Sequence, residues 1–358
     1  MNALEAASLV MIPSGYEDGT LGSLKPLDGS GDFTFSRGSN ISATRVNADG
    51  YIEKGRENLL LHSNDFSQSV WLKLNGASVV GKTATDPFGV ANNAWVVTFD
   101  GTSNARIEQS MGNMLKTSSL YARTQSGTQD VQIGNKTSGI PTFTLTTEWQ
   151  RIEAFSSAGG NPRLRCDDAV ILEIFGFQSE QSLAATPYIE SGTTTGKAGI
   201  LEDMPRVDFS GGNQSLLLEP SRTNLASHSE YLSSISGVTL SNVSLSYTAT
   251  TSPENVGNAN KLVVSNIVDS PTRLFVQTQG SGSQVVSVFA KAGEVNSIAV
   301  SSYTGTAYLW AAYNLTNGSL ISATTDDYGI QDYGNGWYRV WVYVANSTNR
   351  YAQISIGD

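Results

Sequence analysis

Cysteine is almost absent from this chain, since Cys166 is the only one in 358 residues. No intramolecular disulfide can form, so the fold must be held by burial of apolar side chains or by association of chains. The two histidines, His62 and His228, lie far apart in the sequence. The His-Glu-x-x-His spacing of zinc hydrolases is therefore excluded.

Blocks of positive charge and long apolar runs are missing as well. The formal net charge is -10 and no Lys/Arg block occurs, which argues against binding to the phosphate backbone of nucleic acid. The charge favours a neutral or cationic partner, or a bound cation. No window approaches the roughly 20 apolar residues of a transmembrane helix. The start, MNALEAASLVMIPSGYEDG, lacks the basic and apolar regions of a signal peptide, so we expect neither membrane insertion nor a secretory leader.

Helix signals are nearly absent, and short strand signals are abundant. Hydrophobic residues make up 39% of the chain and charged residues 15%, which permits a packed core under an uncharged polar surface. β-Branched and aromatic runs separated by Gly, Asn, Asp and Ser predict many short strands, and hence a sandwich or barrel. The clearest runs are 32–36, 94–99, 118–123, 143–147, 172–177, 285–291 and 337–344.

One stretch of the chain occurs twice. EKGRENLLLHS (53–63) returns as EPSRTNLASHS (219–229), 166 residues later, and both histidines fall at the same place in it. A catalytic pair would not need such matched surroundings, whereas a duplicated module would. The residues of this structural repeat motif that we single out are Glu53, Arg56, Asn58, His62, Glu219, Arg222, Asn224 and His228.

Later landmarks of the two copies keep the same order. SLYAR (119–123) matches SVFAK 168 residues on, and EWQR (148–151) matches GWYR 188 residues on. The added residues lie around YLWAAYNLTNGSLIS (308–322), which predicts an extra hairpin turning at Thr316-Asn317-Gly318. Insertion in a loop, with order preserved, is what a diverged duplication should show.

Hairpins precede the copies, and the ends of the copies differ. Residues 45–56 turn at Ala48-Asp49-Gly50, and 206–222 turn near Gly211-Gly212. The first copy ends with a strand and a tail (169–191), to which AQISIGD (352–358) offers no counterpart. Because an unpaired sandwich edge invites aggregation, we expect either a longer chain or a neighbour that supplies the strand.

Several stretches resemble structural proteins of tailed bacteriophages, especially phages of Bacteroidetes hosts. Residues 8–53 resemble the start of those proteins. LLLEPSRTNLASHSE (216–230) resembles the opening of their carbohydrate-binding-like β-sandwich modules. GNGWYRVWVYV (334–344) resembles a late strand of the modules, and FGFQSEQSLAATPYIES (175–191) their closing stretch.

The resemblance implies a virion protein, namely a head fibre, tail fibre or spike. It implies a homotrimer whose N-terminal segment attaches to phage capsid or tail proteins and whose modules face host cell-surface glycans. It implies no catalytic residues, so we expect no enzyme. Three alternatives stay open: a pure spacer or decoration protein, a bacterial extracellular carbohydrate-binding protein, and part of a glycan-degrading enzyme.

Together these observations predict an all-β chain with an N-terminal β-hairpin attachment segment followed by two tandem jelly-roll-like β-sandwiches. The attachment segment spans 1–56 and the first sandwich 57–191. A linking hairpin covers 192–222 and the second sandwich, which lacks its closing strand, covers 223–358.

Tryptophans are the glycan-binding candidates, because sugars stack on the faces of exposed aromatic rings. Trp149 and Trp337 sit at equivalent repeat positions and are predicted core residues. Trp71, Trp95 and Trp310 have no aromatic counterpart in the other copy, so we single them out as glycan-binding candidates. An aromatic ring at a trimer interface is the alternative.

The polar candidates have structural interpretations beside the functional ones. We expect the imidazole of each repeated histidine to hydrogen-bond backbone at the start of its sandwich. We also expect Arg56 and Arg222 to fix the same corner against Glu53 and Glu219. Asp167-Asp168 and Asp326-Asp327 are adjacent residues, which point to opposite faces of a strand and so make no glycosidase pair. We interpret them as solvated turns, with a structural Ca²⁺ site as the alternative and no other cofactor.

Overall fold

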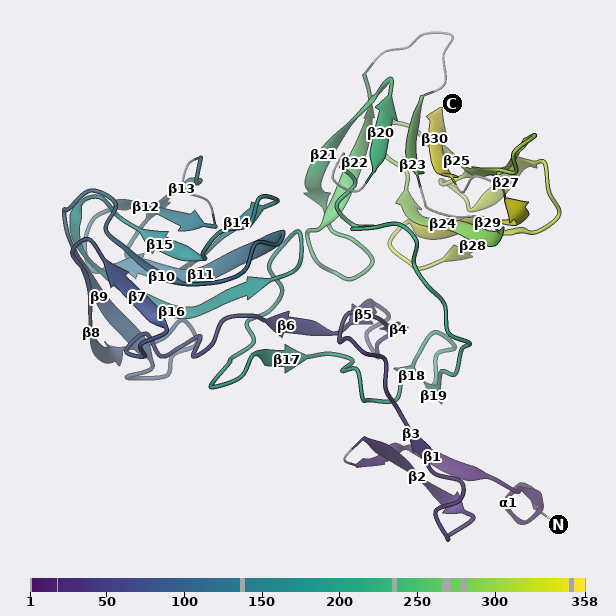
Figure 1. Ribbon diagram of the computed structural model, residues 1–358, viewed down its shortest axis with the longest axis horizontal. Coiled ribbons are helices and arrows are strands. Elements are labelled where there is room, and N and C mark those ends of the chain that lie inside the picture. The colour runs from purple at the N-terminus through teal and green to yellow at the C-terminus, as the bar shows by residue number, and fades with distance from the viewer. Residues whose placement is uncertain are drawn as a thin grey trace. The chain divides into compact units, whose positions relative to one another are not determined.

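The computed structural model of the chain describes residues 2–17, 19–135, 139–233, 237–265, 272–277, 282–347 and 351–357. Within these residues one short helix, α1 (Ala3–Ala6), is accompanied by strands throughout (Figure 1). The predicted all-β class with two tandem sandwiches is confirmed. The chain packs as two compact units, Met1–Arg45 with Glu53–Val207 and Val46–Ile52 with Asp208–Asp358. The narrower boundaries at 56, 191 and 222 stay predictions.

The N-terminal part of the first unit forms a small antiparallel sheet, in the order β1 (Val10–Glu17), β2 (Thr20–Lys25) and β3 (Phe33–Thr34). The Asp32 carboxylate closes this sheet, because it accepts a hydrogen bond from the amide of Ser23 at 2.6 Å. Leu21 is fully buried here, but most of the large apolar side chains around it are exposed. A sheet this small cannot bury them all.

The first sandwich consists of two five-stranded antiparallel sheets. One sheet has the order β13 (Thr142–Leu145), β12 (Gln129–Gly134), β15 (Arg163–Arg165), β10 (Arg106–Gln109), β7 (Trp71–Leu74). The other has the order β14 (Gln150–Ser156), β11 (Lys116–Thr124), β16 (Ala169–Glu180), β9 (Ala94–Asp100), β8 (Ala77–Ala84). The strands are short and alternate in burial because one side chain in two faces the space between the sheets.

A cluster of aromatic rings fills the core of the first sandwich. The Trp71 ring stacks on that of Phe177 with centroids 5.4 Å apart and tilts against Phe66 at 4.9 Å. Both phenylalanines are fully buried. Their burial contributes a large share of the hydrophobic stabilisation in a chain that has no disulfide.

The second sandwich has the same plan with one sheet divided. A six-stranded sheet has the order β20 (Val238–Ser241), β23 (Arg273–Gln277), β30 (Tyr351–Gly357), β25 (Ser297–Tyr303), β26 (Tyr308–Asn314), β27 (Ser319–Ala323). Opposite it lie a two-stranded sheet, β21 (Val243–Thr250) with β22 (Ala259–Val264), and a three-stranded sheet, β24 (Gly282–Lys291), β29 (Trp337–Ser347), β28 (Tyr328–Asp332). Val340, Val342 and Val344 of β29 alternate along WYRVWVYV, share one face of the strand and are fully buried.

A hydrogen bond between matched positions occurs in both sandwiches, although its donor is a tryptophan in one and an asparagine in the other. In the first sandwich Trp95 Nε1 donates to the carbonyl oxygen of Asn64 at 2.9 Å. In the second, Asn260 Nδ2 donates to the carbonyl oxygen of Glu230 at 2.7 Å. The predicted extra hairpin is β26 with β27, and its turn residue Gly318 has φ +68°. A positive φ explains the glycine at this turn.

Short two-stranded sheets accompany the sandwiches. They are β4 (Thr44–Val46) with β5 (Ile52–Lys54), β6 (Arg56–Asn58) with β17 (Gly196–Ala198), and β18 (Val207–Asp208) with β19 (Ser215–Leu216). The predicted turns at Gly50 and Gly212 have φ +83° and +78°. Across the described part of the chain, no helix has the length and apolar character that crossing a membrane requires.

Candidate functional site

The outward face of the six-stranded sheet carries the most suggestive group of side chains. Strand alternation turns Leu309 and Ala311 of β26 toward the core, so Tyr308 and Trp310 point outward together. Tyr308 is 47% exposed and Trp310 is half-buried. We call this surface the Trp310 face and define it by Tyr303, Tyr308, Trp310, Ser301, Gln353 and Arg273.

Polar groups lie beside the rings of the Trp310 face. Ser301 pairs with Trp310 on one side and with Gln353 on the other, which places the three side chains in one row across the sheet. Gln353 Oε1 accepts a hydrogen bond from Arg273 Nη1 at 3.4 Å. The Tyr303 and Tyr308 rings lie next to this row, with centroids 4.9 Å apart. Ser301 is buried, so the Gln353 amide and the Arg273 guanidinium are the polar groups that flank the rings. Such a row suits a ligand that is apolar on its face and polar at its rim.

The other two tryptophan candidates lie elsewhere. Trp71 is 1% exposed, and its Nε1 donates to the carbonyl oxygen of His62 at 3.0 Å. A ring closed off in this way has no face on which a sugar could stack, so its position contradicts a ligand role. The fold needs a large side chain at the centre of the sandwich, and the missing aromatic counterpart in the second copy reflects a different core. Trp95 is 9% exposed and lines a polar cavity.

Trp95 and His62 meet at a polar cavity of about 390 Å³ in the first sandwich. Its charged lining residues are Asp65, Lys82 and Glu190. Burial works to raise the pKa of Asp65, but hydrogen bonds from Ser67 and Gln68 outweigh it and hold that pKa below its usual value. A glycosidase needs a carboxyl group with a raised pKa as its acid, so Asp65 does not suit that role. The cavity can hold a small polar ligand.

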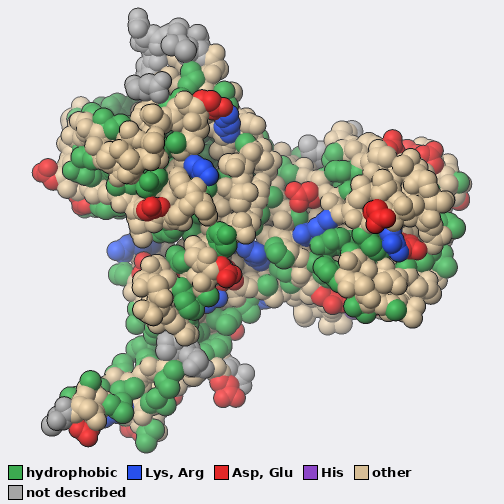
Figure 2. Space-filling view, turned by 180° about the vertical axis from the view of Figure 1, so that it is seen from behind, with side chains coloured by type: hydrophobic (Ala, Val, Ile, Leu, Met, Phe, Trp, Pro, Cys, Tyr) green, Lys and Arg blue, Asp and Glu red, His purple; other side chains and the backbone are tan. Residues whose placement is uncertain are grey.

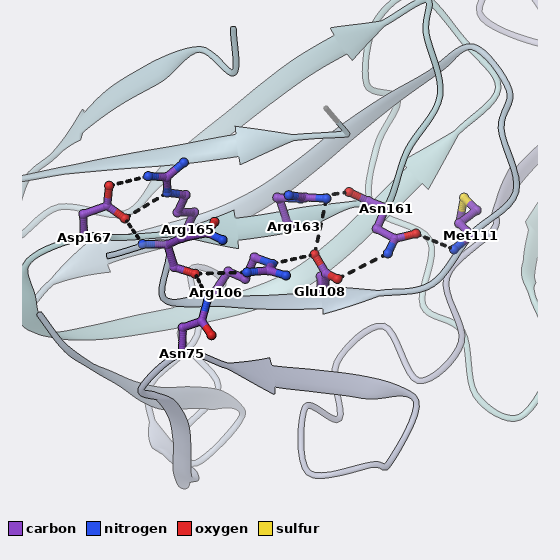
Figure 3. A network of polar contacts seen from close by, with 9 residues as sticks. Asn75, Arg106, Glu108, Met111, Asn161, Arg163, Arg165 and Asp167 are labelled. Carbon is purple, nitrogen blue, oxygen red and sulfur yellow. Dashed lines mark hydrogen bonds and ion pairs between the residues drawn. The ribbon is translucent and has the colours of Figure 1, made fainter. Parts of the chain in front are cut away.

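The equivalent sheet face of the first sandwich is charged. Figure 3 shows Glu108 between two arginines, with its Oε2 at 2.9 Å from Arg106 Nε and 3.4 Å from Arg163 Nη2. Glu108 is 5% exposed, and its other oxygen accepts from Asn161 at 3.3 Å. Burial lowers the pKa of Arg163, and the Glu108 carboxylate opposes this. Charges that are this fully paired fix the strands to one another, and this row holds no aromatic ring.

Register shows that these two faces correspond. Gln132 of the first sandwich pairs with Thr142 and Arg165, as Ser301 of the second pairs with Trp310 and Gln353. Trp310 therefore occupies the place of a threonine. The two copies keep the same backbone and present different chemistry on the same face.

The repeat motif builds the corner of each sandwich. His62 and His228 both have positive φ, and their carbonyl oxygens accept from the amides of Asp65 and Tyr231, three residues later. These hydrogen bonds are made by the main chain, whereas the prediction concerned the imidazole side chains and stays a prediction. The His62 side chain lines the polar cavity.

The predicted Arg56–Glu53 pair is wrong. Glu53 pairs with Arg45 at 2.7 Å, because Arg45 lies on the partner strand of the same hairpin. Arg56 Nε is buried with no hydrogen-bond partner among the described residues. In the second copy, Arg222 Nη1 donates to the adjacent Ser221 carbonyl oxygen.

The aspartate doublets are tied to neighbouring groups. Asp167 accepts from Arg165 Nε at 2.8 Å and from the Asn104 amide at 2.7 Å, and the bond from Arg165 lowers the pKa of Asp167. The main chain of Asp327 accepts from the Tyr343 amide. In the part of the chain that is described, no group of three or more His, Cys, Asp or Glu side chains could hold a metal ion. Cys166 is buried, and burial raises the pKa of its thiol.

Sequence reasoning missed Tyr303 and Tyr308. The signal was available, because alternation within YLWAAY places Tyr308 on the same face as Trp310. Tyr303 joins them only through the pairing of β25 with β26, which the sequence did not predict.

No family model matches this chain, and no curated protein matches it. Solved structures with a similar arrangement include BiXyn10A CBM1 in its apo form, with 12% identity, 31% of this chain and 96% of that chain covered, and a TM-score of 0.21. Another is the family 11 carbohydrate-binding module of Lic26A-Cel5E from Clostridium thermocellum, with 14% identity, 35% and 93% coverage, and a TM-score of 0.24. A third is the enzymatically active domain of tailspike protein 4 of bacteriophage CBA120, with 9% identity, 34% and 21% coverage, and a TM-score of 0.23. These scores and identities are low, so a functional assignment rests on the geometry of the site itself.

Proposed function

We propose that this chain is a fibre or spike protein of a phage particle, assembled as a homotrimer, that binds host cell-surface glycans through the Trp310 face. The observation that carries the proposal is the outward pair Tyr308 and Trp310 beside Ser301 and Gln353. The chain is a binding and structural protein in this proposal, without a catalytic role.

The physical basis is stacking of sugar rings on aromatic rings. An aromatic face carries negative charge density, which attracts the C–H groups of a pyranose. Tyr308 and Trp310 are two residues apart on one strand, so their Cα atoms lie about 7 Å apart. Hydroxyl groups at the sugar rim would then reach Gln353 and Arg273.

Affinity in this proposal comes from repetition. One shallow face binds a sugar weakly, but three chains on one particle engage a glycan surface together. Linked sites of this kind can exceed single-site affinity by a factor of about 10² to 10⁴. A mostly uncharged surface, such as the face in Figure 2 on which charged side chains are few, suits a partner without charge.

The N-terminal segment is the proposed attachment region. Its exposed large apolar side chains are Leu4, Leu9, Ile12, Leu24 and Leu27, the last 89% exposed. Contiguous exposed apolar surface in a small sheet marks a site of protein association. Capsid or tail proteins, and the N-terminal segments of the other two chains, would cover it.

The test is a glycan-array screen of the full chain with Trp310→Ala and Tyr308→Ala variants. We expect binding to at least one glycan class and a loss of at least about tenfold in each variant. Phe88→Ala is the matched control, because Phe88 is a 65% exposed aromatic residue of the first sandwich. Circular dichroism confirms that each variant is folded.

A folded wild-type chain that binds no glycan would support the spacer interpretation instead. Binding that survives both substitutions in the second sandwich but is lost in Trp95→Ala would move the site to the polar cavity.

A further inference from the structure

One strand of the first sandwich, β16, joins two halves of a sheet. It pairs with β11 on one side, where Phe175 lies opposite Tyr121. It pairs with β9 on the other side, where Ile174 lies opposite Trp95. Its inward side chains Leu172, Ile174 and Phe177 are at most 1% exposed, so β16 forms the centre of the sheet and part of the core.

The chain that follows β16 is held by particular side chains. Asn58 Nδ2 donates to the carbonyl oxygens of Phe177 at 3.2 Å and Ile189 at 2.8 Å. Arg151 Nη2 donates to the carbonyl oxygen of Thr186 at 2.6 Å. We call Asn58 and Arg151 the receptor side chains, because they donate hydrogen bonds to the backbone of the stretch from β16 to Ile189.

The second sandwich lacks this joining strand in its described part. β21 and β22 correspond to β8 and β9, and β24 and β29 correspond to β11 and β14. Among the described residues β22 pairs only with β21, and β24 pairs only with β29 and not with a strand on its other side. Two strand edges that a β16-like strand would bridge are thus unpaired, as Figure 1 shows by two separate small sheets.

The receptor side chains are nevertheless present in the second copy. Arg339 lies over the Phe289 ring at 5.9 Å and reaches Ser287 Oγ at 3.5 Å. Arg151 likewise lies over the Tyr121 ring at 5.3 Å and reaches Ser119 Oγ at 3.0 Å.

The two copies differ in how exposed these side chains are. Arg339 and Asn224 are exposed, whereas Asn58 is fully buried and Arg151 half-buried. Within the part of the chain that the structure describes, Arg339 makes no bond like that of Arg151 to Thr186.

We propose that the edges of β22 and β24 bind an extended peptide segment with the side-chain pattern of residues 169–191. The segment would run antiparallel to both strands, insert apolar side chains at the places of Leu172, Ile174 and Phe177, and continue over Arg339 to Asn224. The first sandwich identifies this occupant, because its strands β11 and β9 hold such a segment, β16, between them. The proposal is independent of glycan binding.

The test adds a synthetic peptide of residues 169–191 to the full chain. Hydrogen exchange should slow at the β22 and β24 amides, and the melting temperature of the second sandwich should rise by several degrees. Exchange at β9 and β11 should not change, because β16 already covers them. A peptide carrying Phe177→Asp is the matched control and should have no effect, since it places a charge in the core.

A receptor variant sharpens the test. Arg339→Ala should weaken peptide binding about tenfold, because a charged donor to a backbone carbonyl is lost. Arg165→Ala in the first sandwich is the charge-matched control and should bind normally. Absence of protection at β22 and β24 in a folded chain would overturn the proposal. Protection of both strands in a dimer without added peptide would also overturn it, because a second copy of this chain would then cover these edges.

Discussion

His62 and His228 share one left-handed backbone conformation, with φ of 50° and 49°. This conformation is uncommon for residues other than glycine, although asparagine, aspartate and histidine adopt it more often than most. Each histidine begins a tight turn at the start of its sandwich, because its carbonyl oxygen accepts from the amide three residues later. The two histidines recur because a turn was duplicated with its module.

The positive φ of His62 gives a first prediction about how substitutions there change stability. His62→Gly should leave the free energy of unfolding unchanged or raise it by up to about 1 kcal/mol, because glycine adopts positive φ without strain. His62→Val should lower it by about 1–3 kcal/mol, since a β-branched residue fits this region poorly. Urea denaturation of the full chain measures both. His228→Gly and His228→Val should follow the same order, and a valine tolerated as well as glycine would contradict the account.

Asn58 gives a second prediction, with Asn224 as its matched control. The buried Asn58 side chain bonds the amides of Leu60 and Ser179 and the carbonyl oxygens of Phe177 and Ile189. Asn58→Ala should lower the free energy of unfolding by about 3–5 kcal/mol, because several buried groups lose their partners.

The control should behave differently. Asn224 is exposed and bonds only Ala226 and Ser229 in the described part of the chain, so Asn224→Ala should cost less than about 1 kcal/mol. Scanning calorimetry of the full chain separates the two cases. Equal losses of unfolding free energy in both variants would show that Asn224 is buried in solution, as Asn58 is.

Alkaline pH gives a third prediction through Tyr313. This side chain is fully buried, and its hydroxyl donates to the carbonyl oxygen of Trp341 at 2.8 Å. Burial raises the pKa of Tyr313 from 10.0 to about 12. Because the folded pKa is the higher one, the contribution of Tyr313 is complete below pH 10 and is lost as pH rises toward 12.

The measurement compares the wild-type chain with Tyr313→Phe. The variant should be less stable near neutral pH by about 0.5–1.5 kcal/mol, because the hydrogen bond is gone. The difference between the two chains should shrink between pH 10 and about 12. A difference that stays constant across that window would mean that Tyr313 ionises with equal ease in both states.

Oligomer size gives a fourth prediction. If the exposed apolar side chains of the N-terminal segment hold a trimer, mass photometry should find three times the 38.1 kDa of one chain. Leu24→Ser combined with Leu27→Ser should shift the population to single chains, since both side chains are at least half exposed. Leu320→Ser in the second sandwich, where Leu320 is 39% exposed, is the control and should leave the trimer intact.

Much of the fold was predictable because it depends on local pattern. Alternation in WYRVWVYV places Val340, Val342 and Val344 on one apolar face, and all three are fully buried. The repeat located matched strands, and the Asn-Gly at 317–318 located a hairpin turn. These features follow from strand periodicity and turn chemistry, which neighbours in sequence largely decide.

Less of the candidate site was predictable. Trp71, Trp95 and Trp310 looked alike in the sequence, yet one is buried, one lines a polar cavity and one lies on an outward sheet face. Glu53 was expected to pair with Arg56 but pairs with Arg45 across a hairpin. Such differences depend on which strands pair and in what register, and register involves residues far apart in the chain.

The sequence by itself therefore determined the all-β class, the duplication and the turns, because periodicity and glycine placement act over a few residues. Only the tertiary structure decided which aromatic rings face outward and which polar groups meet them. It also decided that the Trp310 face and the Arg106–Glu108–Arg163 row occupy the same side of equivalent sheets. The physical reason is that a strand's alternation gives two faces, and packing against the opposite sheet selects the one that is buried.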